Sequence, residues 1–150
     1  GKKIKAESPL TTQDLDIGFR VLRLDSSNME DVFYLPKDTD QANLFNTVDN
    51  VKTDRSSEDL LVQVMLELGI PLSSKIENES IHGKNVFSVE QDYLIACFDQ
   101  GINEETITAI AKRKPQYFVM RDNGMATDNV ADNFDQIFKA YSPDTTCKIL

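Results

Sequence analysis

The chain has 150 residues, the size of one ordinary domain, and its 40% hydrophobic and 27% charged residues are typical of a globular protein rather than a disordered segment. Its formal net charge of −9 disfavours a DNA-binding surface, because proteins gain affinity for phosphates by releasing counterions through clustered Lys and Arg. No apolar run approaches the roughly 18 residues that a membrane span needs, and no secretory signal is visible, so we expect a cytoplasmic protein.

The beginning of the chain and its cysteines set further expectations. The chain starts with Gly1 and not with Met, so we expect a fragment of a longer protein, with residues 1–14 as a flexible N-terminal segment of the kind that a tag leaves behind. Residues 15–150 then form a single α/β domain. Two cysteines are too few for a zinc site and make a poor disulfide framework, so we expect Cys97 and Cys147 to be reduced.

The N-terminal third contains two predicted elements. Apolar and polar residues alternate from Leu15, which predicts a half-buried strand over Leu15–Leu24. The turn-forming residues Asp25–Asn28 end this strand, and a loop follows through Pro36. Apolar residues near helical spacing then predict a helix over Asp40–Val51.

A second helix is predicted over Glu58–Leu68, with Ser56 or Ser57 as its N-cap. Gly69 supplies the left-handed residue after its C-terminus, and Pro71 prevents the helix from continuing. Five apolar residues at helical spacing predict the buried stripe of this helix: Leu60, Leu61, Val64, Met65 and Leu68.

The middle of the chain predicts a hairpin and a central strand. Residues Leu72–Ile81 have an extended pattern, His82–Asn85 is typical of a turn, and Val86–Val89 is the return strand. The continuous apolar run Tyr93–Phe98 is bounded by charged residues, which indicates a strand that is buried on both faces of a sheet.

The C-terminal part alternates helices and strands. Asn103 is a predicted N-cap for a helix over Glu104–Arg113, and a strand follows over Gln116–Arg121. Such βαβ units require parallel strands, so we expect an α/β fold: a mixed sheet with a parallel βαβαβ C-terminal half, helices on both faces and one antiparallel hairpin. The last two predicted elements are a helix over Val130–Tyr141, which buries Val130, Phe134, Ile137, Phe138 and Tyr141, and a strand over Thr146–Leu150.

The chain contains no motif for nucleotide or phosphate binding, since its six glycines match neither GxGxxG nor GxxxxGK[ST]. Its only histidine, His82, lies in a predicted turn, where a solvated side chain is a better interpretation than a catalytic one. We therefore predict no catalytic residue, no cofactor-binding residue and no metal ligand in this chain. The acidic residues Glu77, Glu79, Asp92 and Asp99 are expected to form a solvated rim.

Asp99 and Asp122 each follow a predicted strand that precedes a helix, which is where open α/β sheets place ligand sites. Both residues also lie in ordinary turn sequences, and this interpretation is favoured. If a small ligand binds, this edge of the sheet is its expected place. The aromatic residues of the last helix are at core spacing, and we expect Arg20 or Arg23 to pair with a carboxylate.

Five segments, in the same order, resemble the C-terminal part of the DNA methyltransferase (methylation) subunit of Type III restriction-modification systems. Ile17–Asn28 (IGFRVLRLDSSN) is similar to a GFRV-type strand followed by an L-D-x-S-N turn, and Ser57–Gly69 (SEDLLVQVMLELG) is similar to a leucine-rich helix. Leu72–Ile76, Asp92–Phe98 and Phe134–Pro143 also look like segments of this family. The resemblance covers most of the chain from about Leu15.

The family consists of adenine-specific methyltransferases that use S-adenosylmethionine and partner a helicase-nuclease restriction subunit. Its D-P-P-Y and F-x-G-x-G-like motifs are absent here, and no two of the five prolines are adjacent, so methyl transfer is not carried over to these residues. The resemblance implies a non-catalytic assembly domain that serves subunit dimerisation or docking of the restriction subunit. S-adenosylmethionine and DNA would then be bound through the parent enzyme.

Two alternatives stay open at this point. The domain could contact DNA as an auxiliary part of the same enzyme, which salt-dependent binding would reveal. It could also be a stand-alone domain that binds a small ligand at the Asp99 and Asp122 edge, which requires a well-formed pocket there.

Overall fold

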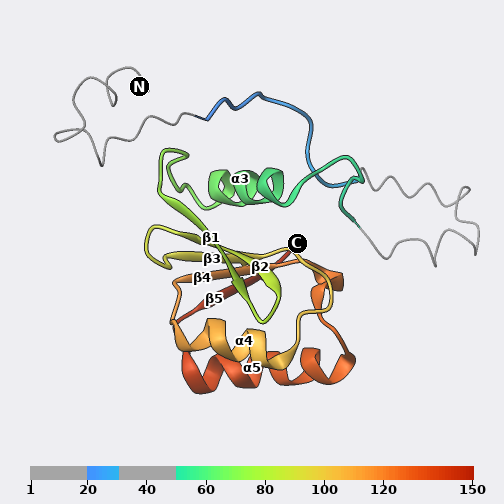
Figure 1. The fold of residues 1–150 in the computed structure, drawn as a ribbon, viewed down its shortest axis with the longest axis vertical. Coiled ribbons are helices and arrows are strands. Elements are labelled where there is room, and N and C mark those ends of the chain that lie inside the picture. Colours follow the sequence, from blue (N-terminus) through green and yellow to red (C-terminus); the bar gives the residue numbers. More distant parts are fainter. Residues whose placement is uncertain (1–19, 31–49) are drawn as a thin grey trace, which may run out of the picture.

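The computed structural model of the chain describes residues 20–30 and 50–150 (Figure 1). Within these residues the chain folds as an α/β protein around one mixed five-stranded sheet, as predicted, and no described helix is long and apolar enough to cross a membrane. The elements are α3 (Ser57–Glu67), β1 (Ile76–Ile81), β2 (Lys84–Val89), β3 (Leu94–Cys97), α4 (Glu104–Lys112), β4 (Tyr117–Met120), the short 3-10 helix η1 (Asp122–Gly124), α5 (Asp128–Tyr141) and β5 (Thr146–Ile149).

The strands lie in the sheet in the order β1-β2-β3-β4-β5, which is also their order along the chain. β1, β2 and β3 pair antiparallel, whereas β3, β4 and β5 pair parallel through the crossover helices α4 and α5. Because both crossovers advance in the same direction, α4 and α5 lie on one face of the sheet, and α3 covers the other (Figure 1). The predicted helices on both faces are therefore confirmed.

A two-residue turn, His82–Gly83, connects β1 to β2. Both residues have positive φ angles, 48° and 78°, as the type I′ turns of two-residue hairpins require. Histidine is one of the residues that tolerates this conformation more often than most. The predicted hairpin is correct, but its turn is shorter than expected, since β2 already begins at Lys84.

The parallel half follows the sequence prediction closely. All four residues of β3 are buried, and the side chain of Asn103 caps α4 by accepting a hydrogen bond from the backbone N–H of Thr106 at 2.9 Å. Phe134 and Phe138 of α5 are buried, and the ring of Phe138 stacks on that of Phe118, with 5.3 Å between centroids. The resulting apolar core lies between the sheet and the two helices α4 and α5.

Tyr141 is a correction to the predicted core, since its side chain is 42% exposed. It is the last residue of α5, where the helix has passed the edge of the apolar cluster. The Nζ of Lys112 lies 5.3 Å from the centroid of its ring, so a cation–π contact takes the place of burial.

The helix α3 forms the second core with the opposite face of the sheet. Ser56 is its N-cap and makes a reciprocal capping box with Asp59, while Gly69 takes a φ of 69° after its end, as predicted. Leu61 and Met65 are fully buried against residues of the sheet. Leu68, predicted as part of the stripe, is half-buried.

The region before α3 differs from the prediction. Residues 20–24, the described part of the predicted strand Leu15–Leu24, form no strand. The predicted helix Asp40–Val51 lies mostly outside the described residues, and at its end Val51 makes an isolated antiparallel bridge with Met29 instead of a helical turn. Residues 1–14 also lie outside the described part of the chain.

Candidate functional site

The loops that carry Asp99 and Asp122 lie side by side, but the two residues make separate contacts. The Asp99 carboxylate accepts a hydrogen bond from the backbone N–H of Asn85 at 2.7 Å and so holds the start of β2. Asp122 begins η1, and its backbone N–H donates to the carbonyl oxygen of Leu150 at 3.1 Å. Each residue therefore has a local structural role.

The loops at this edge are bound to each other. The backbone N–H of Ile102 donates to the carbonyl oxygen of Gly124 at 2.7 Å, and the N–H of Ala126 donates back to the carbonyl oxygen of Ile102 at 2.9 Å. The side chain of Ile102 is fully buried. A Cβ atom at Gly124 would lie 3.2 Å from the Cε of Met120, so this backbone passes close to the core.

The topology explains why these loops close over the strand ends. Doubly wound sheets form a ligand crevice where the strand order reverses and neighbouring loops diverge to opposite faces. In the described sheet the parallel strands β3, β4 and β5 advance in one direction only. The described sheet thus has no reversal point of this kind, and the hollow that Asp122 lines beside α5 does not include Asp99.

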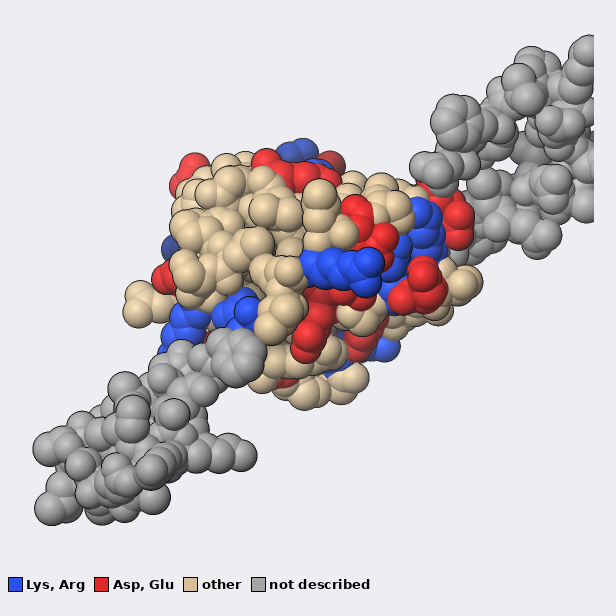
Figure 2. All heavy atoms as spheres, turned by 90° about the horizontal axis from the view of Figure 1, so that it is seen from above, with Lys and Arg blue, Asp and Glu red and all other residues tan. Residues whose placement is uncertain are grey.

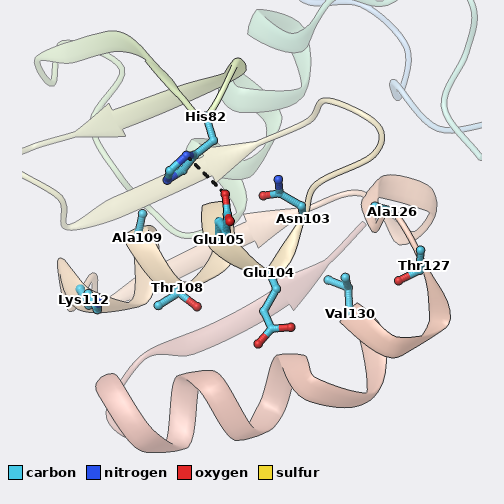
Figure 3. Close-up of a pocket in the computed structure, with 10 residues that line it drawn as sticks. All are labelled: His82, Asn103, Glu104, Glu105, Thr108, Ala109, Lys112, Ala126, Thr127 and Val130. Carbon is cyan, nitrogen blue, oxygen red and sulfur yellow. Dashed lines mark ion pairs between the residues drawn. The ribbon is translucent and has the colours of Figure 1, made fainter.

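His82 lines a hollow of about 870 Å³ that runs along α4 to the start of α5 (Figure 3). Its Nδ1 lies 3.9 Å from a carboxylate oxygen of Glu105, and the two side chains are 47% and 77% exposed. A catalytic relay would need a nucleophile within hydrogen-bond distance of the imidazole. Thr108 and Thr127 line the hollow, but the only described contact of the imidazole is with Glu105, so the geometry favours a solvated surface histidine.

The two cysteines are free and poorly suited to nucleophilic chemistry. Burial raises the pKa of the Cys97 thiol to about 11 and that of Cys147 to about 11. The thiolate is the reactive form of cysteine, and at neutral pH these thiols stay protonated. Both therefore act as small apolar residues of the core between the sheet and α5.

An ion-pair cluster around Arg113 is the strongest polar feature of the described residues. The guanidinium, at the C-terminal end of α4, donates to both carboxylate oxygens of Asp92, with an Nε–Oδ2 distance of 2.8 Å, and also to Glu79 of β1. The buried hydroxyl of Ser88 donates to the Asp92 carboxylate at 2.6 Å. The cluster joins β1, the β2–β3 connection and α4.

These contacts change the titration of the pair. Burial raises the pKa of the Asp92 carboxyl, but hydrogen bonds from Arg113 and Ser88 outweigh it and hold the pKa below its ordinary value. The hydrogen bonds to Asp92 in turn keep the pKa of the Arg113 guanidinium above its ordinary value. Asp92 thus departs from the predicted solvated rim, whereas Glu77 is exposed and pairs with Lys75 at 2.6 Å.

Three consecutive residues in the β2–β3 connection have left-handed backbone conformations. Glu90, Gln91 and Asp92 have φ angles of 50°, 55° and 69°, although none is a glycine. The turn is held by the Asp92 contacts and by two hydrogen bonds between Glu90 and Lys75, one of 3.0 Å and one of 3.1 Å. Such strain persists only where the surroundings fix the conformation from several sides.

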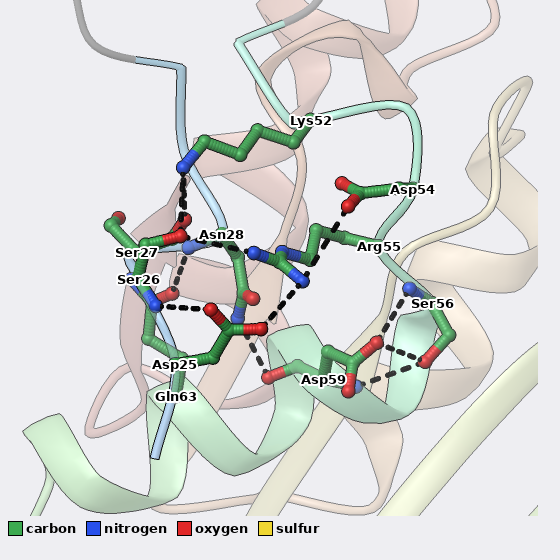
Figure 4. A network of polar contacts seen from close by, with 10 residues as sticks. All are labelled: Asp25, Ser26, Ser27, Asn28, Lys52, Asp54, Arg55, Ser56, Asp59 and Gln63. Atoms are coloured by element: carbon green, nitrogen blue, oxygen red, sulfur yellow. Dashed lines mark hydrogen bonds and ion pairs between the residues drawn. The ribbon is translucent and has the colours of Figure 1, made fainter. Parts of the chain in front are cut away.

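A second polar network docks the Asp25–Asn28 turn on the start of α3 (Figure 4). The amide Nδ2 of Asn28 donates to the carbonyl oxygen of Asp59 at 2.9 Å, and its backbone N–H donates to the side chain of Gln63 at 3.2 Å. The backbone of Asn28 also accepts a hydrogen bond from the N–H of Lys52 at 2.9 Å.

Two cations complete this network. The Nη1 of Arg55 lies 3.3 Å from the carboxylate of Asp25, and the Nζ of Lys52 donates to the carbonyl oxygen of Ser27 at 2.8 Å (Figure 4). The hydrogen bond from the backbone of Ser26 and the charge of Arg55 lower the pKa of the Asp25 carboxyl. The turn therefore serves to attach its segment to α3.

Arg20 continues the same attachment. It donates to the carbonyl oxygens of Leu72 and Ser74 at 3.3 Å and 3.0 Å, and so contacts backbone oxygens rather than the carboxylate that we expected for Arg20 or Arg23. Among residues 20–30 and 50–150, no group of three or more His, Cys, Asp or Glu side chains could hold a metal ion.

No protein-family model matches this chain, and no curated protein or solved structure matches it either.

Proposed function

We propose that this chain is the non-catalytic assembly domain of a site-specific adenine DNA methyltransferase of a Type III restriction-modification system. In this role it joins two methylation subunits or docks the restriction subunit. The observation that supports the proposal best is the way in which the family-like segments pack. The described part of Ile17–Asn28 attaches to Ser57–Gly69 through Asn28 and to Leu72–Ile76 through Arg20.

The remaining family-like segments meet in the centre of the fold. Ile95 of β3, from Asp92–Phe98, shares one buried cluster with Phe134 and Phe138 of α5. Segments far apart in sequence thus depend on each other for their burial, as expected of segments that belong to one domain. This arrangement supports the interpretation that the whole domain, and not only a set of short motifs, resembles the family.

The charges favour a protein partner over DNA. Several described cations are already paired with carboxylates: Arg113 with Asp92, Lys148 with Glu67, and Arg55 with Asp25. On the face seen in Figure 2, Lys and Arg side chains lie beside Asp and Glu side chains. A paired cation in a chain of net charge −9 has little to offer a phosphate, because its counterion is a carboxylate held by the protein.

The proposal is tested by titrating the chain with S-adenosylmethionine in a calorimeter and by native mass spectrometry with the methylation and restriction subunits of its own system. We expect no heat from S-adenosylmethionine and a stable complex with one of the two subunits. Tight binding of S-adenosylmethionine, methylation of adenine by the chain alone, or a complex with neither subunit would contradict the proposal. Salt-dependent binding to a DNA duplex would favour the auxiliary DNA-contacting role instead.

A further inference from the structure

The two edge strands of the sheet differ in how they are protected. The edge strand β1 carries Glu77 and Glu79, which are tied to Lys75 and Arg113, and charged side chains of this kind prevent a further strand from pairing. At the other edge, β5 has the sequence TCKI, and its one charged residue, Lys148, turns to Glu67 of α3. β5 therefore carries one charged side chain where β1 carries two.

The outer edge of β5 presents backbone groups for a further strand. The backbone N–H groups of Thr146 and Leu150 donate to carbonyl oxygens of Gln116 and Met120 at 2.9 Å each, which directs the even-numbered residues toward β4. Since successive residues of a strand alternate, the N–H and C=O groups of Cys147 and Ile149 point to the outer edge. Within residues 20–30 and 50–150, no strand pairs with this edge.

A hollow with both apolar and acidic lining residues lies at Ile149 of β5. It has a volume of about 540 Å³, and its lining includes Met125, Ala131, Phe134 and Ile149. Ile149 is 47% exposed and lines this hollow together with the buried Phe134. A strand added to β5 would place the side chains of one of its faces in this hollow, as extended peptides do when they extend a sheet.

The charge at the hollow indicates the kind of strand. Asp122 and Asp135 are both exposed and line it, and no Lys or Arg does so. A second copy of β5 would bring a second Asp135 toward the first, and like charges in such proximity are unfavourable. A basic strand is attracted to the same place.

We propose that the outer edge of β5 binds an extended segment of a partner protein, with apolar residues alternating with lysine or arginine, as an added β-strand. The inference rests on the proposed function, because it names the surface on which the partner subunit sits. Backbone pairing with Cys147 and Ile149 gives the affinity, the hollow selects apolar side chains, and Asp122 and Asp135 select a basic segment.

The experiment titrates isotope-labelled chain with a synthetic peptide of alternating valine and lysine and, separately, with its valine–glutamate counterpart. We expect the backbone amide resonances of Cys147 and Ile149 to shift, and these amides to become protected from hydrogen exchange, with the basic peptide only. The double variant Asp122→Lys/Asp135→Lys should bind it about tenfold more weakly. The single variant Asp135→Lys should also bind more weakly, whereas its matched control Asp132→Lys, on the same helix but outside the hollow, should bind like the wild type.

Each other outcome overturns the inference. Amides of Cys147 and Ile149 that stay unshifted at millimolar peptide, or equal binding of both peptides, would remove the site or its charge selectivity. Self-association that protects these two amides would make a second copy the occupant. Thermal unfolding of each variant excludes loss of fold. Ile149→Lys places a long side chain in the hollow without changing the aspartates, and it should also weaken binding of the basic peptide. If the chain captures a subunit but the amide resonances of β5 do not shift, only this inference is contradicted. If the chain binds the basic peptide but captures neither subunit, only the proposed function is contradicted.

Discussion

The two faces of the sheet are built in different ways. The face under α4 and α5 is made mostly by the continuous segment Leu94–Ile149, in which each helix directly connects the strands it covers, and Val86 of β2 and Ile81 of β1 add to its core. The opposite face has only α3, which comes from before the hairpin and is joined by residues 20–30 through polar contacts. Because the packing of the first face is mostly local in sequence, we expect the α3 face to open first in the native protein.

The largest expected effect is on the face under α4 and α5. Phe138→Ala removes a buried ring that packs on Phe118 and Phe134, with centroid distances of 5.3 Å and 5.0 Å, and should lower the free energy of unfolding by about 3–5 kcal/mol. Denaturant unfolding measures this loss. The control Leu66→Ala changes a side chain that is 60% exposed on α3 and should cost less than about 0.5 kcal/mol. Equal losses in the two variants would contradict the comparison.

The Arg113 cluster ties the α4 end to the hairpin, and Arg113→Met should cost about 2–3 kcal/mol at neutral pH, because Asp92 keeps a half-buried charge without its partner. The pKa of Asp92 is lowered in the folded state, so its contribution to stability is present above the ordinary value of 3.8 and is lost as the pH falls through the folded-state value.

The wild type should therefore lose stability below about pH 4 more steeply than Arg113→Met. Unfolding by urea at a series of pH values compares the two slopes, with Lys139→Met on the exposed side of α5 as the control. If the free energies of unfolding of the variant and the wild type fall in parallel as the pH decreases, the Arg113–Asp92 pair does not stabilise the fold in the way described.

A smaller effect is expected where the Asp25–Asn28 turn attaches to α3. Asn28→Ala removes the hydrogen bond to the carbonyl oxygen of Asp59 and should cost about 1 kcal/mol. Native-state hydrogen exchange should become faster in α3 and stay unchanged in β4. Asn129→Ala, at an exposed position of α5, is the matched control. Faster exchange in both elements would show that the two faces open together.

The last expected effect is a gain of similar size. Gln91 is exposed and has a φ of 55°, a left-handed backbone conformation that is unfavourable for a residue with a Cβ atom. Gln91→Gly removes this cost and should stabilise the fold by about 1 kcal/mol. Gln91→Ala keeps a Cβ and should bring no gain. A thermal unfolding midpoint that falls in the glycine variant would contradict the structural account of the turn.

The sequence predicted most of the parallel half because its signals are local. Each strand there is a short apolar run, and Asn103 caps the helix that follows the first of them. The alternation in Leu15–Leu24 was misleading over its described part, since residues 20–24 are joined to their neighbours by the side chain of Arg20 and not by backbone pairing. Alternation shows that a segment has two faces and does not show that another strand lies beside it.

The polar clusters could not be predicted from local patterns. Arg113 and Asp92 are 21 residues apart, and neither has a neighbour that signals their pairing. The left-handed turn that contains Asp92 includes no glycine, which is the residue that usually marks this conformation. The placement of Asp99 and Asp122 after strands was correct, but only the strand order could show that their loops close on each other.

Hydrogen exchange on this chain, alone and after addition of S-adenosylmethionine, the methylation subunit or the restriction subunit, tests the central claim most directly. We predict slower exchange over one continuous surface when one of the two subunits is added, and no change with S-adenosylmethionine. Slower exchange with S-adenosylmethionine, together with no change on addition of either subunit, would contradict the claim that this domain assembles an enzyme whose chemistry lies elsewhere.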